Sequence, residues 1–242
     1  MDQSDTLAAM NSLITGPLGT SMNAPADKAG ELLGDPLPPE PLALASAWLA
    51  EAWERGIQPN PNAMALATST PDGHPSVRIV LCKNLVVVPG YVKFYTNYLS
   101  RKGGELAANP RAAAVLHWDA FGRQVRIEGA VVPAPAEDSD AYFATRSRGS
   151  RIGAWASAQS RPVPSRAALL EQVAEQTRHF GERADVPRPP HWGGFRLWAD
   201  SVELWVDGQA RIHDRARWTR DLRADGAGGF TPGPWSATRL QP

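Results

Sequence analysis

The chain has 242 residues, of which 43 % are hydrophobic and 21 % are charged, which is enough for one large domain with a substantial core. Its 25 basic and 25 acidic residues balance, and this argues against a general polyanion binder or a membrane-surface protein, while local patches stay compatible with it. Because Cys82 is the single cysteine, neither a disulfide framework nor a cysteine-based metal site can form within one chain.

The N-terminal residues 1–40 are rich in proline, glycine, aspartate and small side chains, and this composition predicts a flexible arm preceding a domain at 41–242. Residues 1–27 contain no lysine or arginine and no long apolar run, so a secretory signal is not predicted. No stretch approaches the length of a membrane span. We therefore expect a soluble, cytoplasmic protein.

A helix is predicted at 41–55, because Pro41 suits a first helical turn and Gly56 suits a helix end. Its apolar positions recur with helical spacing and form one stripe. They are Ala45, Trp48, Leu49, Ala52 and Trp53.

From residue 62 onward the pattern changes to short β-rich runs separated by turn residues. The predicted strands are 63–70, 76–83, 91–97, 111–118, 123–132, 195–199, 202–206, 211–218 and 235–240. The predicted helices among them are 100–109, 136–146, 150–158 and 165–180, and residues 226–234 are predicted to be a loop. The fold class is therefore mainly β with flanking helices (α+β), with an antiparallel barrel or sandwich as its core.

One cluster of hydrogen-bond donors lies in YFATRSRGSRIGAWASAQS, residues 142–160, which contains no acidic residue. On a helix, Tyr142 and Arg146 share a face, and Ser150 is placed where the next helix is predicted to begin. A phenol, a guanidinium and a serine at a helix start form a compact site for one phosphate or carboxylate. The alternative is a solvated arginine-rich turn.

A second cluster spans residues 78–104, again without an acidic residue. Its cations are Arg78, Lys83, Lys93, Arg101 and Lys102. Positive side chains at a helix start oppose the helix dipole unless an anion is present, and the pair that follows Ser100 therefore favours a phosphate site. Ordinary exposed cations remain the alternative.

A third cluster is RIHDR. On the predicted strand, Arg211, His213 and Arg215 alternate and would share one face, where their charges favour an anionic or electron-rich ligand. Trp205 on the preceding strand could add a stacking surface.

The sequence lacks the paired carboxylates of a glycosidase, a glycine-rich phosphate loop, metal-ligand spacing and a nucleophile elbow. Anion sites without a nucleophile or an acid–base apparatus indicate that a bound cofactor performs the difficult chemical step.

Many separate motifs along residues 40–242 resemble the pyridoxine/pyridoxamine 5′-phosphate oxidase family. They are NAMALAT, RIVLCK, FYTNYLSRKGGEL, NPRAAAVLHW, RQVRIEG, YFATRSRGSRIGAWASAQS, VPRPPHWGGFRL, VELWVDGQARIHDR and WSATRLQP, in this order. Members of that family are homodimeric, FMN-binding split β-barrels with the flavin at the subunit interface. The resemblance implies the same fold, FMN as the cofactor and no metal.

The resemblance also implies roles for individual residues. The implied FMN-binding residues are Arg78, Ile79, Val80, Leu81, Cys82, Lys83, Tyr95, Thr96, Arg101, Lys102, Gln124, Gln159, Ser160, Trp205 and Arg215. Among them, Gln159 and Ser160 are expected from the partner subunit. The implied substrate-binding residues are Lys83, Tyr142, Arg146, Ser150, Arg211 and His213, and the implied catalytic residues are Arg211 and His213.

The implied reaction is the oxidation of pyridoxine or pyridoxamine 5′-phosphate to pyridoxal 5′-phosphate, with hydride transfer to the flavin and O2 as the final acceptor, giving H2O2. One departure is that residues 1–40 contain neither arginine nor tyrosine, whereas the family has an Arg/Tyr-containing lid there. Two alternatives stay open: a related flavin oxidase of another aromatic, such as a phenazine precursor, or a non-catalytic flavin- or B6-binding protein. A nucleic-acid binder is disfavoured by the zero net charge.

Overall fold

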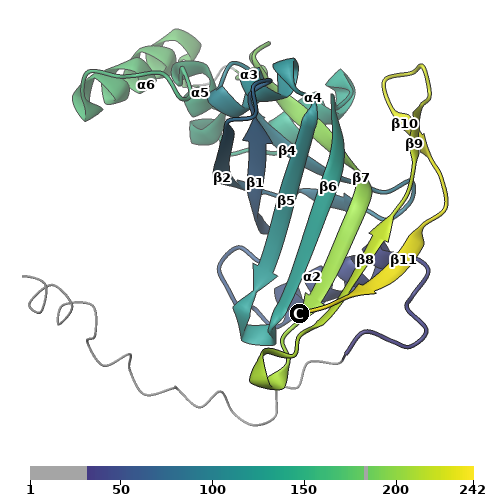
Figure 1. The fold of residues 1–242 in the computed structure, drawn as a ribbon. Coiled ribbons are helices and arrows are strands. Elements are labelled where there is room, and N and C mark those ends of the chain that lie inside the picture. Colours follow the sequence, from purple (N-terminus) through teal and green to yellow (C-terminus); the bar gives the residue numbers. More distant parts are fainter. Residues whose placement is uncertain (1–31, 183–184) are drawn as a thin grey trace, which may run out of the picture.

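The computed structural model describes residues 32–182 and 185–242. Most of the predicted N-terminal arm, residues 1–31, lies outside the described residues. The predicted fold class is confirmed: one large antiparallel sheet carries several flanking helices (Figure 1).

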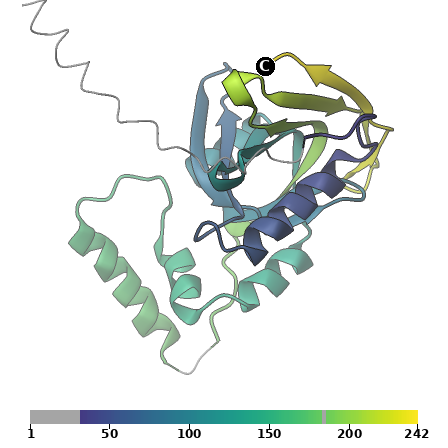
Figure 2. The same ribbon diagram turned by 90° about the horizontal axis from the view of Figure 1, so that it is seen from below.

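The main sheet is built from strands β1 to β8 and β11. Their bounds are β1 Ala63–Ser69, β2 Pro75–Leu81, β3 Asn84–Val86, β4 Tyr91–Asn97, β5 Arg111–Trp118, β6 Arg123–Pro133, β7 Trp192–Val206, β8 Asp214–Thr219 and β11 Ser236–Leu240. Hydrogen bonds give the order β11-β8-β7-β6-β5-β1-β2, and β4 joins β3 to the first half of β7. Viewed along the strands, the sheet curls into an incomplete ring (Figure 2).

Strand β7 connects the two halves of this sheet. Its first half, from Trp192 to Trp198, pairs with β4, and its second half, from Ser201 to Val206, pairs with β8. The sequence predicted two strands here, 195–199 and 202–206, but the backbone continues through the intervening residues as one strand. The neighbouring strand β6 accommodates the bend with a register shift at Glu128/Gly129.

Gly129 is required by close backbone approach at this bulge. A Cβ atom at this position would lie 1.8 Å from the carbonyl oxygen of Trp198, which real Cβ contacts do not reach. Any larger residue would push β6 away from β7.

The core fills the interior of the curled sheet and is closed by helix α2, Pro41–Glu54. Its largest fully buried side chains include Trp118, Trp218 and Phe94. Helix α2 contributes Leu42, Ala45, Trp48 and Ala52 to this core, as the predicted apolar stripe requires. Trp53 was predicted to belong to the stripe, but it is exposed, so this part of the prediction is wrong.

The other helices lie beyond one end of the sheet. They are α3 Arg101–Ala108, α4 Ala136–Ala144, α5 Arg148–Ala156 and α6 Arg166–Phe180. Figures 1 and 2 both show α6 extending away from the sheet, and none of its residues is buried. Helices α3 to α5 are therefore the ones that can shape a site at this end.

Residues 32–40 differ from the prediction of a flexible arm up to residue 40. The side chain of Leu33 is buried in the core, and its amide donates to Asp214 at 2.7 Å. The indole of Trp218 donates to the carbonyl of Pro38 at 2.8 Å. Arg239 of β11 also donates to the carbonyl of Leu33 at 3.3 Å. These contacts hold the segment against β8 and β11.

The C-terminal part differs in two further places. Residues 211–213 were predicted to begin a strand, but β8 starts at Asp214, and residues Gln209–Arg211 form a short 3-10 turn, η2. The predicted loop 226–234 contributes to a small hairpin of β9 Leu222–Ala224 and β10 Phe230–Pro232. In both places, residues typical of turns lie next to or within a strand, so the sequence pattern did not predict where the strand begins or ends.

Candidate functional site

A polar cavity of about 330 Å³ opens between strands β2 and β4 and helices α3 and α4. Its lining combines cations, phenols and apolar side chains. These residues are Arg78, Ile79, Val80, Leu81, Lys83, Tyr95, Thr96, Lys102, Tyr142, Arg146, Gln159 and Trp192. Two clusters that are separate in the sequence, 78–104 and 142–160, thus meet in one cavity.

Lys102 provides a buried cation at one side of this cavity. Its Nζ donates to Gln159 Oε1 at 2.7 Å, Thr96 Oγ1 at 3.0 Å and Ser100 Oγ at 3.3 Å, all of which are uncharged. Burial, aided by the nearby charge of Arg78, lowers the pKa of Lys102 to about 8. A buried ammonium held only by neutral acceptors is suited to an anionic ligand.

The start of helix α3 adds to this anion site. Ser100 is its N-cap and accepts a hydrogen bond from the amide of Gly103, and the first turn contains no acidic residue. The free amides and dipole of a helix N-terminus favour negative charge. Of the two cations in this turn, Arg101 already pairs with Glu105 of the same helix, whereas Lys102 has only neutral partners. The predicted phosphate site at this helix start stays a prediction, and Lys102 is the cation that most favours it.

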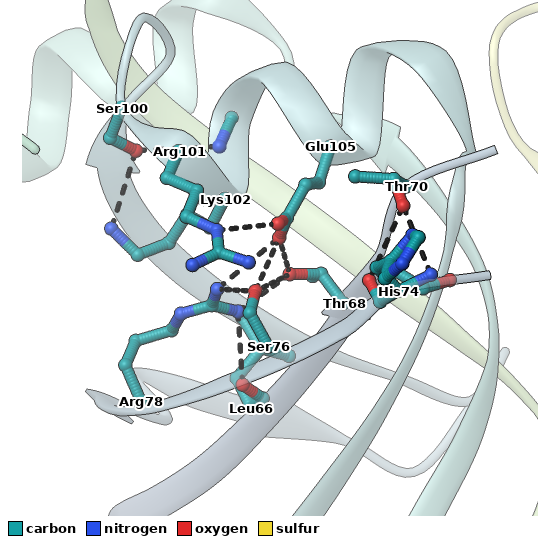
Figure 3. Close-up of polar contacts among 12 residues, drawn as sticks. Leu66, Thr68, Thr70, His74, Ser76, Arg78, Ser100, Arg101, Lys102 and Glu105 are labelled. Atoms are coloured by element: carbon teal, nitrogen blue, oxygen red, sulfur yellow. Dashed lines mark hydrogen bonds and ion pairs between the residues drawn. The ribbon is translucent and has the colours of Figure 1, made fainter. Parts of the chain in front are cut away.

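Arg78 reaches the same region from strand β2. Its guanidinium donates to Thr68 Oγ1 at 2.6 Å and Ser76 Oγ at 2.5 Å, and lies 3.3 Å from the carboxylate of Glu105 (Figure 3). Oε1 of Glu105 also accepts a hydrogen bond from Nε of Arg101 at 2.9 Å. Two cationic side chains thus share one buried carboxylate beside the cavity.

Aromatic side chains line the opposite part of the cavity. Tyr142 stacks on Tyr95 with a centroid distance of 4.2 Å, and Tyr95 stacks nearly parallel on Trp192 at 5.5 Å. Burial, with the negative charge of Asp138 nearby, raises the pKa of Tyr95 to about 12, so its phenol stays neutral. Flat, neutral walls of this kind suit a planar aromatic ligand.

Arg146 lies over the Trp192 ring at 4.7 Å and over Phe143 at 5.4 Å. Its Nη1 is buried and has no hydrogen-bond partner among the residues that the structure describes. A buried guanidinium nitrogen without a partner is costly, so this donor is arranged for a ligand that brings an acceptor.

A second cavity, of about 320 Å³, lies behind Arg146 and shares Gln159 and Trp192 with the first. Ser150 lines this second cavity and not the first. It was predicted to start helix α5, but the N-cap is Ser147, whose Oγ accepts from the amide of Ser150. The prediction missed the position by one helical turn, since several serines there could serve as caps.

Five of the predicted residues, Gln124, Trp205, Arg211, His213 and Arg215, form a separate group at the other end of the sheet. Gln124, Trp205 and Arg215 lie side by side on β6, β7 and β8. His213 packs against Trp205, with ring centroids 4.6 Å apart. In Figure 1 the turn after β7, which carries Arg211, lies at the lower end of the sheet, whereas α3 and α5 lie at the upper end.

The expected alternation of Arg211, His213 and Arg215 on one strand is wrong. Arg211 is exposed in η2 and has a φ of 64°, and Ala210 before it has a φ of 53°, so the backbone turns here. Arg215 is bound by the buried carboxylate of Glu203 at 2.7 Å. His213 Nδ1 lies 3.0 Å from the carboxylate of Asp207.

Cys82, Arg101 and Ser160, which were also predicted as FMN-binding residues, do not line the first cavity. Cys82 is buried in the core, where burial raises the pKa of its thiol to about 12. Ser160 is exposed with a φ of 72°. Gln159 lines the cavity of its own chain, where it accepts from Lys102, and its expected contribution from the partner subunit stays a prediction.

Sequence reasoning missed four residues of the site. They are Trp192, Asn97, Glu105 and Asp207. Trp192 lies inside the quoted run VPRPPHWGGFRL, so it could have been found there. Glu105 and Asp207 also lie inside quoted runs, FYTNYLSRKGGEL and VELWVDGQARIHDR, and Glu105 follows Arg101 at the i,i+4 spacing of a helical ion pair. Their contacts with Arg78 and His213 could not be predicted from the sequence.

Lys93, counted among the cations of residues 78–104, is not available to a ligand. Its Nζ is paired with Asp138 of helix α4 at 2.8 Å. Within residues 32–182 and 185–242, no group of three acidic, histidine or cysteine side chains could hold a metal, and no helix has the length and apolarity to cross a membrane.

The curled antiparallel sheet and its cavity of cations and aromatic rings define a split barrel with a site for a planar, anionic ligand. Family models support a closer assignment. A model described as pyridoxamine 5′-phosphate oxidase matches residues 49–180, and one described as the pyridoxine 5′-phosphate oxidase C-terminal dimerisation region matches residues 192–242.

Curated relatives carry the same name. A pyridoxine/pyridoxamine 5′-phosphate oxidase of Sphingopyxis alaskensis is 53% identical over 75% of this chain and 82% of its own length. A protein of that name from Rhodospirillum rubrum is 49% identical over 84% of this chain and 96% of its own. This chain belongs to the pyridoxamine 5′-phosphate oxidase family.

Solved structures share the fold. PhzG from Burkholderia lata 383, in complex with tetrahydrophenazine-1-carboxylic acid, is 34% identical with a TM-score of 0.75, covering 86% of this chain and 95% of PhzG. A pyridoxamine 5′-phosphate oxidase-related, FMN-binding protein from Nostoc punctiforme is 16% identical with a TM-score of 0.60, covering 83% of this chain and 96% of its own, which supports the fold alone.

Proposed function

We propose that this chain is an FMN-dependent oxidase that converts pyridoxine 5′-phosphate or pyridoxamine 5′-phosphate to pyridoxal 5′-phosphate, with O2 as the acceptor and H2O2 as the second product. The observation that carries the proposal is one cavity that is lined by aromatic side chains and by four cations. Arg78 lies near Lys102, and Lys83 and Arg146 both lie near Tyr142. Two phosphorylated, planar molecules fit this distribution of charge.

The residues present fit FMN. Lys102, held by neutral acceptors at the N-terminus of α3, would bind the flavin phosphate together with Arg101 and Arg78. FMN, when bound, supplies the capacity to accept a hydride and to pass electrons to O2.

The substrate phosphate is assigned to Tyr142 and Arg146. The unpartnered Nη1 of Arg146 would donate to a phosphate oxygen, and the Tyr142 ring, which Lys83 approaches at 5.4 Å, would bound the pyridine side of the site. Holding the substrate at two ends fixes its orientation, and this can lower a barrier by several kcal/mol. Substrate oxidation removes a hydride from C4′ and a proton from its hydroxyl or amino group, and the imine formed from the amine is hydrolysed to aldehyde and ammonia.

A homodimer would complete the site. Trp205, Arg211, His213 and Arg215 lie within the residues that match the dimerisation region, and within one chain they lie at the other end of the sheet from the cavity. We propose that each protomer contributes these residues to its partner's cavity, with FMN at the interface. There Arg211 would orient the substrate ring, and His213 would assist proton movement.

The test is an oxygen-uptake assay with pyridoxine phosphate, pyridoxamine phosphate, their dephosphorylated forms and tetrahydrophenazine-1-carboxylic acid. The phosphorylated B6 vitamers are expected to be oxidised fastest. The PhzG likeness keeps the phenazine substrate as the second candidate, and faster oxidation of that compound would favour it. A protein that binds flavin but does not bleach it anaerobically with any of these compounds would be a binder and not an enzyme.

A further inference from the structure

Glu105 is a buried carboxylate beside the cavity, in the second half of helix α3. Its side chain is 4% exposed, and it lies between α3 and strands β1 and β2 (Figure 3). It does not line the cavity itself. A charge buried this deeply requires several hydrogen-bond partners, and the partners of Glu105 show which side chains it holds in place.

Each oxygen of Glu105 has its own set of donors. Oε2 accepts from Thr68 Oγ1 at 2.5 Å and from Ser76 Oγ at 2.6 Å, with Arg78 Nη2 at 3.3 Å. Oε1 accepts from Nε of Arg101 at 2.9 Å. Strands β1 and β2 and helix α3 are therefore joined through one carboxylate.

The directions of these hydrogen bonds follow from the chemistry of an ionised carboxylate, which only accepts. The hydroxyl hydrogens of Thr68 and Ser76 must both point to Glu105. Their oxygen lone pairs are then free to accept from Arg78, at 2.6 Å and 2.5 Å. Glu105 thus orients two hydroxyl groups that hold the Arg78 guanidinium.

Arg101 is held in a different way. Its Nε is occupied by Glu105, and its two terminal nitrogens have no partner among residues 32–182 and 185–242. The guanidinium is held at one edge by Glu105, and its other edge is exposed at the start of α3, outside the lining of the cavity. This arrangement is suited to bidentate recognition of phosphate.

The network keeps Glu105 ionised. Burial alone would favour the neutral acid, but the hydrogen bonds from Ser76, Thr68 and Arg101 outweigh it and lower the pKa of Glu105 to about 2. The directional pattern therefore persists throughout the neutral range.

We propose that Glu105 is a positioning residue that sets the affinity for the phosphate of FMN by fixing Arg78 and Arg101 before the flavin binds. This rests on the proposed function. The carboxylate does not touch the flavin and acts through the two arginines. Preorganised donors need not be ordered when the anion binds, and this increases affinity.

The experiment compares FMN with riboflavin, which shares the ring system and lacks the phosphate. Full-length protein is stripped of flavin, and the Kd of each compound is measured from the quenching of flavin fluorescence. Glu105→Gln keeps the shape of the side chain but adds an N–H donor facing Arg78 or the hydroxyls. We expect the Kd for FMN to rise about tenfold or more, which is the loss of one charge-assisted hydrogen bond, and the Kd for riboflavin to change less than about twofold.

Glu51→Gln is the matched control, because Glu51 also joins two arginines, Arg55 and Arg123, but lies on α2 away from the cavity. It should leave both constants unchanged. Thr68→Val provides a second variant that removes one oriented hydroxyl, and it should weaken FMN binding selectively but less than Glu105→Gln. If circular dichroism shows that Glu105→Gln does not fold, the Kd values of Thr68→Val for FMN and riboflavin test the proposal instead.

Equal losses for FMN and riboflavin would show a merely structural role and overturn the proposal. Tighter FMN binding by Glu105→Gln would also overturn it, because the carboxylate would then act by repelling the phosphate. If the unaltered protein did not prefer FMN to riboflavin, the proposed function itself would fail. If instead the unaltered protein prefers FMN and Glu105→Gln keeps the same preference, only the role of Glu105 is rejected.

Discussion

Asp207 and His213 form a carboxylate–imidazole pair, with Oδ1 of Asp207 3.0 Å from Nδ1 of His213. The amide of Gly208 also points to this nitrogen, at 3.2 Å. An acceptor and a donor therefore compete for one ring atom, and its proton decides which contact is favourable. When Nδ1 carries the proton, Asp207 fixes the ring and leaves Nε2 to face a ligand.

Asp207→Asn is expected to lower kcat about tenfold while FMN stays bound, because outer carboxylates that orient a functional histidine have effects of this order. Oxygen uptake gives kcat, and the flavin absorbance of the purified variant gives its FMN content. Asp200→Asn is a suitable control, because Asp200 lies on β7, the strand that Asp207 directly follows, but pairs with Arg111. Unchanged kcat in Asp207→Asn would remove this pair from catalysis.

Arg146→Ala is expected to raise the KM for pyridoxine phosphate about tenfold to a hundredfold and to leave bound FMN unchanged, because the lost donor serves the substrate phosphate. Oxidation of dephosphorylated pyridoxine should be affected much less. Arg166→Ala, at the exposed start of α6, is the control. A KM equal to that of the unaltered protein would assign the phosphate to other residues.

The affinity for FMN should decrease as the pH rises through about 8. Free Lys102 has a pKa lowered to about 8, mainly by burial, and a bound phosphate would raise it again. Above this pH the protein must take up a proton to bind, so the Kd for FMN rises by up to about tenfold per pH unit. Measuring the Kd for FMN between about pH 6.5 and 9.5, a range that brackets the pKa of Lys102, checks the slope. In Lys102→Met the slope should vanish, and a slope that persists would point to another group.

Acid should destabilise the protein through Glu105. Its pKa is lowered from 4.5 to about 2 in the fold, so its stabilisation is complete above about pH 4.5 and is lost as the pH falls toward 2. Glu105→Gln removes this titration. Urea unfolding at several pH values should therefore show a smaller loss of stability between pH 4.5 and 2 in the variant, and parallel curves would contradict the assignment.

Periodicity and turn residues predicted most of the fold. Helix α2 ends within one residue of its predicted limit, and strands β1, β4 and β5 lie where the β-rich runs between turn residues predicted them. The errors concern residues whose placement depends on partners far along the chain. Residues 32–40 are fixed by β8 and β11, and the continuity of β7 depends on the bulge in β6.

In the candidate site, too, local patterns predicted individual residues but not the contacts between distant parts of the chain. Local patterns identified Lys102 and Arg146, which the structure brings to one cavity. They could not show that Glu105 lies against Arg78, because that contact joins residues of different elements. The positive φ of Arg211 was also hidden, since the DGQA turn continues beyond its glycine.

The length of β7 has a consequence for dilute solutions of the protein. Trp192, at one end of the strand, lines the cavity, and Trp205, near the other end, contacts His213. From residue 192 to residue 205 an extended chain advances about 40 Å, so an isolated subunit cannot bring both ends to one ligand. Specific activity should therefore fall when the protein is diluted below its dissociation constant, and adding an inactive variant with an intact cavity should restore part of it by forming mixed pairs.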